Sequence, residues 1–496
     1  MKKNVVCAAV VAVVVVGCCN RQACPAKAVV KAPCSDSVEE GFEPLFGHWD
    51  MPKWEGATYM YKVGSDPQTG MRGVVQCRPD LFKQGKGSDI FTKKEYRNFI
   101  LRFEFVMPEN GNNGVGIRMV PNRDSAYWGM CELQLLDDGG SSYYDKNAKK
   151  DKLKPYQYTG SVYGVVPARR DNVGKQTWGK DALFAGGGSY LRKAGMWNFE
   201  EIKVVGSEIE VNLNGYVITK ADVSKFKGDG DTPDGKAHPG LHNDKGRIGF
   251  LGHGSNVKWR NVRIKELADD AKMSDLAAEP MVDAAAMAAA GYTAYFTGRE
   301  AELKSMWKGV TTEEKFDNPY VRQAATPAKR EMMQRLADLQ RDEHWTVRDG
   351  TLCFDGFKGG YSLATKRNYG DFELWCDWRT MSVTGDSGLY LRGSPQVQIW
   401  DAYNEWGIGS GGLFNNVKNP SSAIAIADRH IGDWNRFHVI MRGDKVTVFL
   451  NGVKVVDNVT LENYWNRSKP IFASEQIELQ CHGDPTEWRN VFIREL

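Results

Sequence analysis

The sequence predicts an all-β protein that contains two tandem β-sandwich domains of the jelly-roll type. The first observation behind this prediction is an internal repeat. Residues 253–267 begin with His-Gly and close with Trp-Arg-Asn-Val-Arg-Ile-Lys-Glu-Leu, and residues 482–496 repeat this phrase nearly unchanged at the same spacing. The second is a series of short segments in which apolar and polar residues alternate between Gly, Asn and Asp turns. Many short strands with few helices are typical of sandwiches and jelly rolls.

The repeat extends upstream through both halves of the chain. The further matches, in the first and then the second copy, are Gly114–Arg118 with Gly388–Arg392, Trp197-Asn198 with Trp434-Asn435, and Asn214-Gly215 with Asn451-Gly452. The period is about 230 residues, which is far longer than the repeat of a solenoid. The pattern therefore indicates a duplicated domain.

Strands are expected wherever the alternation has period 2. It is clearest in residues 99–105, 202–213 and 437–450. The Asn-Gly pairs at 214–215 and 451–452 each follow such a segment, and Asn-Gly favours the tight turn of a β-hairpin. Each copy should therefore contain a strand pair closed by this turn.

One segment of the second copy has a helical pattern instead. Thr326 and Pro327 form an N-cap and first-turn pair, and Met332, Leu336 and Leu339 follow at positions i, i+4 and i+7. The sequence predicts an amphipathic helix over 327–343, whose apolar face we expect at the junction of the two domains.

The N-terminus is typical of an exported protein. Lys2 and Lys3 precede the apolar run 5–16, which is too short to span a bilayer. The run ends at Val-Gly-Cys18, which resembles a bacterial lipoprotein signal with Cys18 as the lipidated residue; an ordinary cleaved signal is the alternative. We expect a cell-envelope lipoprotein, facing the periplasm or in the outer membrane, that contacts the membrane through the lipid on Cys18.

These patterns divide the chain into five parts. They are a signal peptide (1–17), a tether (18–41), a first β-sandwich (42–267), a partly helical linker (268–291) and a second β-sandwich (292–496) with a helical insertion at about 308–344.

Composition excludes several classes of protein. The net charge is +3 and no basic stripe stands out, so there is no case for nucleic-acid binding. The five cysteines after the tether form no Cys-x-x-Cys pattern, which argues against structural zinc and favours buried thiols. No nucleotide cofactor is expected.

Alternation also assigns polar side chains of the second domain to one face of a sheet. Since successive side chains of a strand point to opposite faces, three neighbouring strands contribute to that face Tyr390, Arg392, Gln396, Gln398, Trp400, Glu478, Gln480 and His482. An aromatic ring among convergent polar groups is typical of a carbohydrate site. A solvated sheet surface is the alternative.

The first domain repeats this face in part. Arg118, Glu132, Gln134 and His253 take matching positions. Gly249 and Leu251, however, stand where the second copy has Glu478 and Gln480, whereas Gln396 stands where the first has Glu132. Each copy thus lacks a carboxylate that the other keeps, and the second is the better candidate for catalysis.

The ordered motifs resemble the 3-keto-disaccharide hydrolase family, formerly a domain of unknown function. The segments that carry the resemblance in the second copy are 345–352, 369–374, 387–392, 397–401, 434–435, 450–452, 479–483 and 488–490, and the first copy matches through 114–118, 132–137, 160–164 and the His253 segment. The resemblance implies two concanavalin A-like lectin/glucanase folds.

It also implies cleavage of sugars that a separate sugar 3-dehydrogenase has oxidised at C3. A C3 ketone acidifies the C2 proton, so that a base can remove it and the C1 substituent can leave. Water then adds to complete a net hydrolysis. Such a reaction needs a base, an acid and a cation for the enolate.

Roles follow from the resemblance. In the second copy we expect His482 as base or ligand of a divalent metal ion, Glu478 as its carboxylate partner, and Arg392 for the enolate or the hydroxyls. Gln398, Trp400, Tyr390 and Gln480 would bind substrate. In the first copy Glu132, Gln134, Arg118 and His253 would take the matching roles.

Other interpretations stay open at this point. Either histidine could cap a turn, and Cys481, next to His482, could supply a thiol although alternation places it in the core. The whole protein could be a lectin-like carbohydrate-binding protein without catalysis, or a structural envelope lipoprotein. In a composite site, one domain would be catalytic and the other would form one side of the site. Such a site would explain how the protein can be active although each copy lacks a carboxylate.

Overall fold

The structure is a computed structural model that describes most of the chain after the tether. The described residues are 38–67, 70–83, 87–120, 129–145, 147–148, 150–172, 184–185, 187–276, 283–383, 385–402 and 408–496. The predicted signal peptide, Cys18 and nearly all of the predicted tether lie outside these residues.

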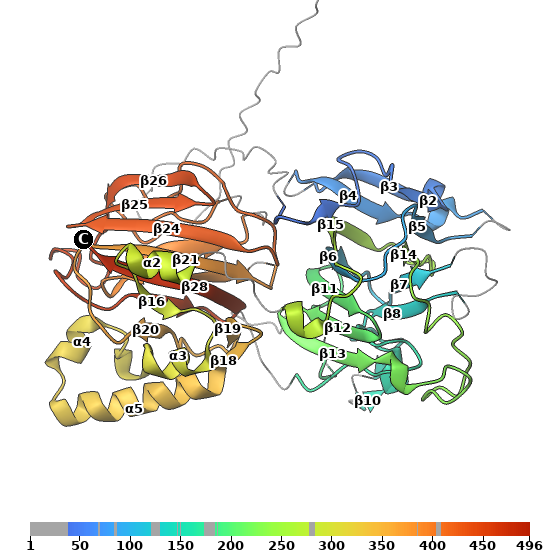
Figure 1. The fold of residues 1–496 in the computed structure, drawn as a ribbon, viewed down its shortest axis with the longest axis horizontal. Coiled ribbons are helices and arrows are strands. Elements are labelled where there is room, and N and C mark those ends of the chain that lie inside the picture. The colour runs from blue at the N-terminus through green and yellow to red at the C-terminus, as the bar shows by residue number, and fades with distance from the viewer. Residues whose placement is uncertain are drawn as a thin grey trace, which may run out of the picture. The chain divides into compact units, whose positions relative to one another are not determined.

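The first half forms a sandwich of an eight-stranded and a five-stranded sheet (Figure 1). The larger sheet has the order β13-β12-β11-β6-β15-β4-β3, with β1 also paired to β15, and the smaller has the order β2-β5-β14-β7-β8. The strands are β1 (Glu43–Pro44), β2 (Trp54–Gly56), β3 (Tyr61–Ser65), β4 (Arg72–Cys77), β5 (Ile90–Thr92), β6 (Phe99–Val106), β7 (Asn112–Met119), β8 (Cys131–Leu136), β11 (Trp197–Val205), β12 (Glu208–Leu213), β13 (Tyr216–Asp222), β14 (Arg247–Phe250) and β15 (Lys258–Glu266), with a separate hairpin of β9 (Tyr144–Asp145) and β10 (Lys150–Asp151).

The second half repeats this topology strand for strand. Its larger sheet has the order β18-β19-β28-β21-β24-β25-β26, with β16 paired to β28, and its smaller sheet the order β17-β20-β27-β22-β23. The strands are β16 (Thr293–Phe296), β17 (Trp307–Gly309), β18 (Trp345–Arg348), β19 (Thr351–Asp355), β20 (Leu363–Thr365), β21 (Phe372–Thr380), β22 (Asp386–Leu391), β23 (Ser394–Trp400), β24 (Asn435–Arg442), β25 (Lys445–Leu450), β26 (Val453–Thr460), β27 (Glu478–Cys481) and β28 (Pro485–Glu495). The all-β prediction and the two tandem sandwiches are confirmed.

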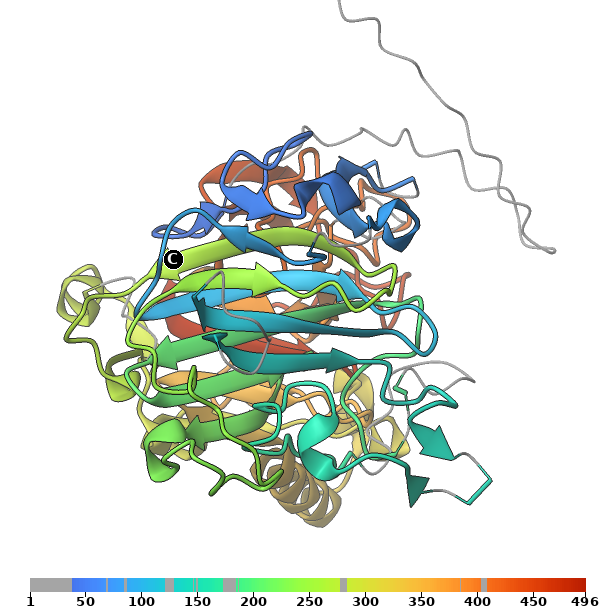
Figure 2. The ribbon, with the colours of Figure 1, turned by 90° about the vertical axis from the view of Figure 1, so that its right-hand side faces the viewer.

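Alternating side chains fill the space between the two sheets of each half. Figure 2 shows the strands of the first half. In β6, Leu101 and Phe103 are fully buried in the core of the first sandwich. Asn214 and Gly215 both have positive φ, as do Asn451 and Gly452, which is the backbone that a two-residue hairpin turn requires. The five cysteines outside the N-terminal segment are free and buried, as predicted.

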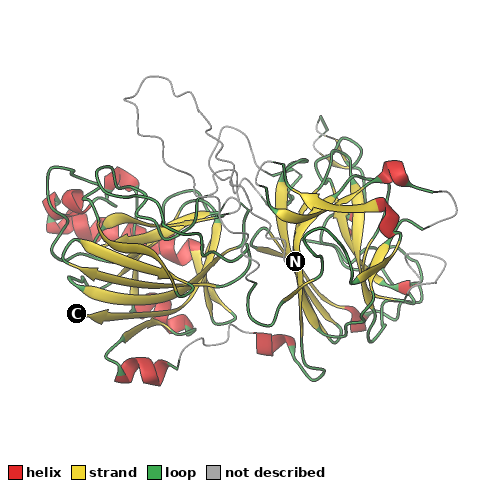
Figure 3. Ribbon diagram, turned by 90° about the horizontal axis from the view of Figure 1, so that it is seen from above, coloured by secondary structure: helices red, strands yellow, loops and turns green. Residues whose placement is uncertain are grey.

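Helices are few and lie outside the sheets (Figure 3). They are α2 (Ala284–Ala289), α3 (Glu300–Ser305), α4 (Pro319–Ala324) and α5 (Pro327–His344), with short 3-10 turns at Thr58–Met60, Pro79–Leu81, Pro155–Gln157, Val223–Lys225, Met273–Leu276 and Glu313–Lys315. None of the helices among the described residues has the length and apolar character needed to cross a bilayer.

The apolar face predicted for α5 is wrong. Thr326 does cap the helix, accepting a hydrogen bond from the Lys329 amide. Met332 and Leu339, however, are 53% and 68% exposed, and the buried stripe runs through Met333, Ala337, Arg341 and His344. The stripe packs on β17 of the same sandwich, where Arg341 donates to the carbonyl of Trp307. The helix comes close there because Gly309 has no side chain; a Cβ at this position would lie 1.9 Å from the carbonyl oxygen of Ala337. The helix therefore does not seal the junction of the two domains.

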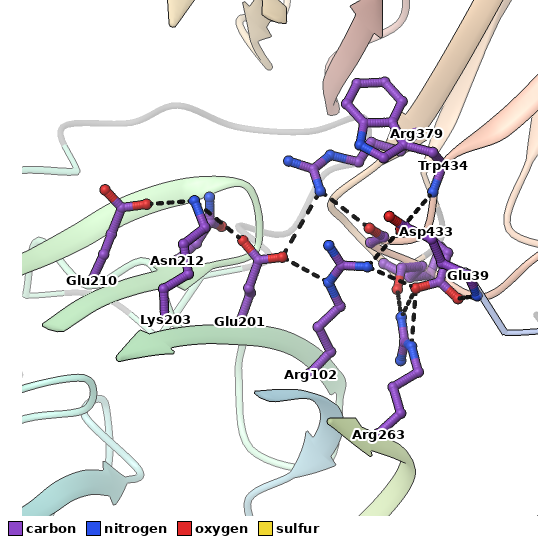
Figure 4. A network of polar contacts seen from close by, with 12 residues as sticks. Glu39, Arg102, Glu201, Lys203, Glu210, Asn212, Arg263, Arg379, Asp433 and Trp434 are labelled. Atoms are coloured by element: carbon purple, nitrogen blue, oxygen red, sulfur yellow. Dashed lines mark hydrogen bonds and ion pairs between the residues drawn. The ribbon is translucent and has the colours of Figure 1, made fainter. Parts of the chain in front are cut away.

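The two sandwiches meet through buried ion pairs (Figure 4). Asp433 of the second, with no exposed side-chain surface, accepts hydrogen bonds from Arg102 (2.9 Å) and Arg263 (2.7 Å) of the first. Arg102 also binds Glu201 at 2.7 Å. Beside this network lies a small apolar cluster of Phe199, Met381, Val383 and Ile431. Buried charges are tolerated only when paired, so this arrangement specifies how the copies contact each other.

Candidate functional site

His482 and Asp386 form an ion pair on the smaller sheet of the second sandwich. Nδ1 of His482 lies 3.1 Å from Oδ2 of Asp386, and the two side chains are 36% and 21% exposed. Burial lowers the pKa of His482, but the carboxylate of Asp386 outweighs this effect, so the pKa lies above its ordinary value. The imidazole is thus held in one orientation and stays partly exposed to solvent.

Gln398 and Trp400 surround this pair. The strands β22 and β23 pair in antiparallel register, with Asp386 opposite Trp400 and Gly388 opposite Gln398. The amide of Gln398 donates to Oδ1 of Asp386 at 2.7 Å. The indole of Trp400 is partly exposed and meets Phe414 edge to face, with 5.2 Å between the ring centroids. The structure thus brings together three of the residues chosen from the sequence and one, Asp386, that was not.

Asp484 adds a second carboxyl group beside His482. Its Oδ1 accepts a hydrogen bond from Ser382 Oγ at 3.0 Å, and the side chain is nearly fully buried. Burial raises the pKa of Asp484 to about 6, an effect that the cation of Arg192 partly offsets. Its charge in turn raises the pKa of His482. We refer to His482, Asp386, Asp484, Gln398 and Trp400 as the His482 site.

Glu478 does not partner His482, contrary to the expectation from the sequence. The two residues are four positions apart along one chain segment, which corresponds to roughly 13 Å of strand. Glu478 is 1% exposed and accepts a hydrogen bond from Gln476 at 2.7 Å. Burial raises its pKa to about 7, although Arg322 lowers it. Alternation assigns both residues to one face of the sheet but gives no distance between them along the strand.

The other predicted residues of the second copy lie along the same sheet. Tyr390 pairs with Glu478 in the register of β22 and β27, so these two lie together. Gln480 is opposite Gly388, and its Oε1 has no hydrogen-bond donor among the described residues. Arg392 is buried at the end of the strand, where it donates to the carbonyl of Ala473. This arginine supports a loop rather than the His482 site.

In the first copy Glu132 and Gln134 lie together. The side-chain amide of Gln134 lies 2.9 Å from that of Asn112 and 3.2 Å from the Glu132 carboxyl. Burial raises the pKa of Glu132 to about 7, and repulsion from Asp89 adds to this effect. This carboxyl group is therefore part of a small polar cluster on the face that corresponds to the His482 site.

The histidine of the first copy is not supported in the same way. His253 is exposed and makes no hydrogen bond or ion pair with the described residues. The repeat places Asn112 where the second copy has Asp386, and Ser255 where it has Asp484. Arg118 donates to the carbonyls of Arg97 and Asn243, which is a structural role. Both carboxyl groups that shift the pKa of His482 are thus absent from the first copy.

Sequence reasoning could have found one of the two missing residues. Asp386 is two positions before Gly388, so the alternation that selected Tyr390 also assigns Asp386 to the polar face. Asp484 lies in the loop between β27 and β28, where alternation carries no information. No pattern in the sequence indicated that Arg192 would approach it.

The proposed metal ligands do not form a common site. Glu478 and His482 have different partners and are separated along the strand, as described above. Among the described residues, no three His, Cys, Asp or Glu side chains are grouped so that they could hold a metal ion.

The protein is a tandem β-sandwich protein. On one sheet face of its second sandwich, a histidine lies among carboxyl groups and an aromatic side chain. The chain belongs to the family of the 3-keto-alpha-glucoside-1,2-lyase-like domain, which matches residues 41–265 and 293–494. The resemblance seen in the motifs is thereby confirmed for both copies, and the protein is carbohydrate-active in the broad sense of its family.

Three solved structures that are similar to the chain each match about one sandwich or less of it. A candidate glycosyl hydrolase from Parabacteroides distasonis has 26% identity and a TM-score of 0.33, and the match covers 46% of this chain and 99% of that one. A second candidate glycosyl hydrolase from the same organism has 22% identity and a TM-score of 0.35, with 46% and 95% covered. A carbohydrate-binding module from Bacillus subtilis has 12% identity and a TM-score of 0.20, with 29% and 86% covered. No curated protein matches the chain.

Proposed function

We propose that the protein cleaves 3-keto-glycosides by β-elimination and that the reaction takes place at the His482 site. The observation that carries this proposal is the contact between His482 and Asp386 in a chain that belongs to the lyase-like family. A histidine held by a carboxylate is a common form of general base. Trp400 supplies an aromatic surface beside it, on which the apolar face of a sugar ring could stack.

The chemistry balances as an elimination across C1 and C2 of the sugar. The base takes the C2 proton, the C2–H electron pair becomes the C1–C2 double bond, and the C1–O bond breaks. The leaving alkoxide takes a proton and departs as an alcohol, and the enone that remains then adds water. The C3 ketone makes the C2 proton acidic enough to be removed because the negative charge spreads onto the ketone oxygen.

The residues of the His482 site fit these needs. Asp386 faces Nδ1 of His482, so the proton would be taken up at Nε2 on the far side of the ring. Asp484, with a pKa of about 6, is part protonated near neutral pH and could supply the proton for the leaving oxygen. The buried Oε1 of Gln480 needs a hydrogen-bond donor, which a sugar hydroxyl would provide.

Solvent exchange distinguishes this chemistry from ordinary hydrolysis. The full-length protein is incubated in D₂O with a 3-keto-glucoside, and NMR follows both aglycone release and deuterium at C2. Elimination followed by hydration predicts deuterium at C2 of the released sugar. Cleavage with C2 still fully protonated would overturn the elimination. A parallel reaction with a chelator tests the divalent metal, which stays a prediction; its outcome decides how the enolate is stabilised.

A lectin-like carbohydrate-binding protein is the second candidate. The first copy favours it, because Asn112 and Ser255 stand at the positions of Asp386 and Asp484. Binding of a 3-keto-glucoside without release of the aglycone would support this alternative and exclude the enzyme.

We also propose that the protein is a cell-envelope lipoprotein anchored through Cys18. The support is the basic and apolar N-terminal sequence that ends in Val-Gly-Cys. A sugar 3-dehydrogenase would then supply its substrate. Labelling of the protein with a fatty-acid analogue, lost in Cys18→Ala, tests the anchor.

A further inference from the structure

Arg192 of the first sandwich reaches across the junction to the His482 site of the second. Its Nη2 contacts Oγ of Ser382 and lies 4.0 Å from Oδ1 of Asp484. The side chain is 3% exposed. Ser382 also binds Asp484 at 3.0 Å, so a chain of polar contacts runs from the first copy to the carboxyl beside His482.

Other groups of the first sandwich lie at the same place. The turn between β12 and β13 packs on the second sandwich, where a Cβ added to Gly215 would lie 2.4 Å from Pro485. Tyr216 follows this turn. Burial raises the pKa of its hydroxyl group, and the nearby carboxyl groups of Asp355 and Asp484 raise it further. The loop that carries His482 and Asp484 is thus held from the side of the first copy.

The repeat provides an internal comparison for Arg192. The equivalent residue of the second copy is Arg429. The main-chain amide of Arg192 donates to the side chain of Asn198, and that of Arg429 donates to the equivalent Asn435. The Arg429 side chain donates to the carbonyl of Trp434, within its own sandwich. The same local structure therefore presents an arginine to a neighbouring acid only at Arg192.

We propose that Arg192 is a positioning residue of the His482 site, which fixes the carboxyl of Asp484 so that the site in the second sandwich is complete only with the first sandwich in place. The role of Arg192 in catalysis rests on the proposed function, whereas its contacts with Ser382 and Asp484 do not depend on that function. It gives the first copy a purpose although it lacks the carboxyl groups around its own histidine.

The electrostatic surroundings of His482 give the inference a direct readout. The groups that act on its charge are Asp386, Asp484 and Lys358, and the groups that act on Arg192 are Asp484, Asp401 and Tyr216. Without the Arg192 cation the pKa of Asp484 rises, so this carboxyl group is protonated to a larger extent near neutral pH. Its negative charge then supports the imidazolium form of His482 less, which lowers the affinity of His482 for a proton.

The test compares two buried arginines of the first sandwich in the full-length protein. Arg192→Ala removes the contact with Asp484, whereas Arg263→Ala removes a contact with Asp433 at the same junction but away from the site. Arg192→Lys keeps a cation. Thermal unfolding of all three variants shows how far each one loosens the junction.

Two measurements decide the outcome. NMR titration of the His482 ring, assigned with His482→Ala, should show a lowered pKa in Arg192→Ala and a wild-type value in Arg263→Ala. With a 3-keto-glucoside, kcat should fall roughly 10- to 100-fold in Arg192→Ala with KM nearly unchanged, and Arg192→Lys should recover part of the rate. Equal effects of Arg192→Ala and Arg263→Ala, or an unchanged His482 titration, would overturn the inference. A wild-type protein without turnover refutes the proposed function instead, and the titration still decides the role of Arg192.

Discussion

Oδ2 of Asp386 lies 3.1 Å from Nδ1 of His482, and the duplicated chain has Asn112 where this aspartate stands in the second copy. The two copies share a fold and a histidine but not the carboxylate that raises the histidine's pKa. The two copies therefore differ in the charge beside the repeated histidine within a single protein.

The first prediction concerns that charge. Asp386→Asn keeps the shape of the side chain and removes the carboxylate that stabilises the imidazolium form. The pKa of His482 should fall, so the acidic limb of the kcat/KM profile moves to lower pH while the plateau drops roughly 100-fold. A pH–rate series from pH 5 to about 9 measures both changes. The matched control is Asn112→Asp in the first copy, for which we expect an unchanged profile. An unaltered limb in Asp386→Asn would show that His482 is not the titrating base.

The second prediction concerns Trp400. If the indole stacks on the sugar ring, Trp400→Ala should raise KM about tenfold or more with a smaller change in kcat, because an aromatic contact made equally in substrate and transition state affects binding. Phe414→Ala removes the edge contact to the indole and should have a weaker effect of the same kind. Initial-rate kinetics give both constants. A large loss of kcat at constant KM would instead place Trp400 next to the reacting atoms.

The third prediction concerns the junction of the two sandwiches. Asp433→Asn leaves Arg102 and Arg263 buried without their shared carboxylate, and the loss of one partner from a buried ion network costs about 3–5 kcal/mol. Urea unfolding of the full chain measures the cost. Glu266→Gln, at an exposed pair with Lys94, provides the control and should cost less than about 1 kcal/mol. Equal costs for the two variants would mean that the junction does not depend on its ion pairs.

The fourth prediction concerns Glu200, which points into the core beside Glu201 of the ion network. Both carboxyl oxygens of Glu200 are buried without a hydrogen-bond partner among the described residues. Burial raises its pKa to about 8, and repulsion from Asp138 adds to this. Between pH 4.5 and about 8 the folded protein therefore keeps a proton on Glu200 that the unfolded chain has released. The free energy of unfolding falls as the pH rises through this range.

Glu200→Met should remove that dependence. The variant should be more stable than the wild type at pH 8, with little difference near pH 4. The second copy supports the substitution, since an apolar residue, Phe437, stands at the equivalent position. Thermal unfolding at several pH values tests this, and a variant that loses stability at pH 8 would show that the ionised group has a partner in the folded protein.

Much of the fold could be predicted from the sequence because strands and turns have local signals. The Asn-Gly turns, the alternation in β6 and the repeated closing phrase each act over a few residues. The face predicted for α5 is wrong because two stripes compete on this helix. Leu339 belongs to the more apolar stripe, but the stripe with Ala337 packs closely on β17, where Gly309 has no side chain in the way.

The site could be predicted only in part for a related reason. Alternation places His482, Gln398 and Glu478 on one face, but it gives no distance between strands, so the wrong carboxylate was paired with the histidine. Asp386 was within reach of the same rule. The approach of Arg192 to Asp484 depends on how two separate sandwiches dock, which no local pattern records.

The most direct test of the account compares the two repeated histidines in one assay. The full-length protein, His482→Ala and His253→Ala are each given a 3-keto-glucoside with a chromogenic aglycone, and release of the aglycone is followed by absorbance. We predict turnover by the wild type, near wild-type turnover by His253→Ala, and a loss of at least about 1,000-fold in His482→Ala. Full activity of His482→Ala, or an equal loss in both variants, would contradict the assignment of catalysis to the second copy.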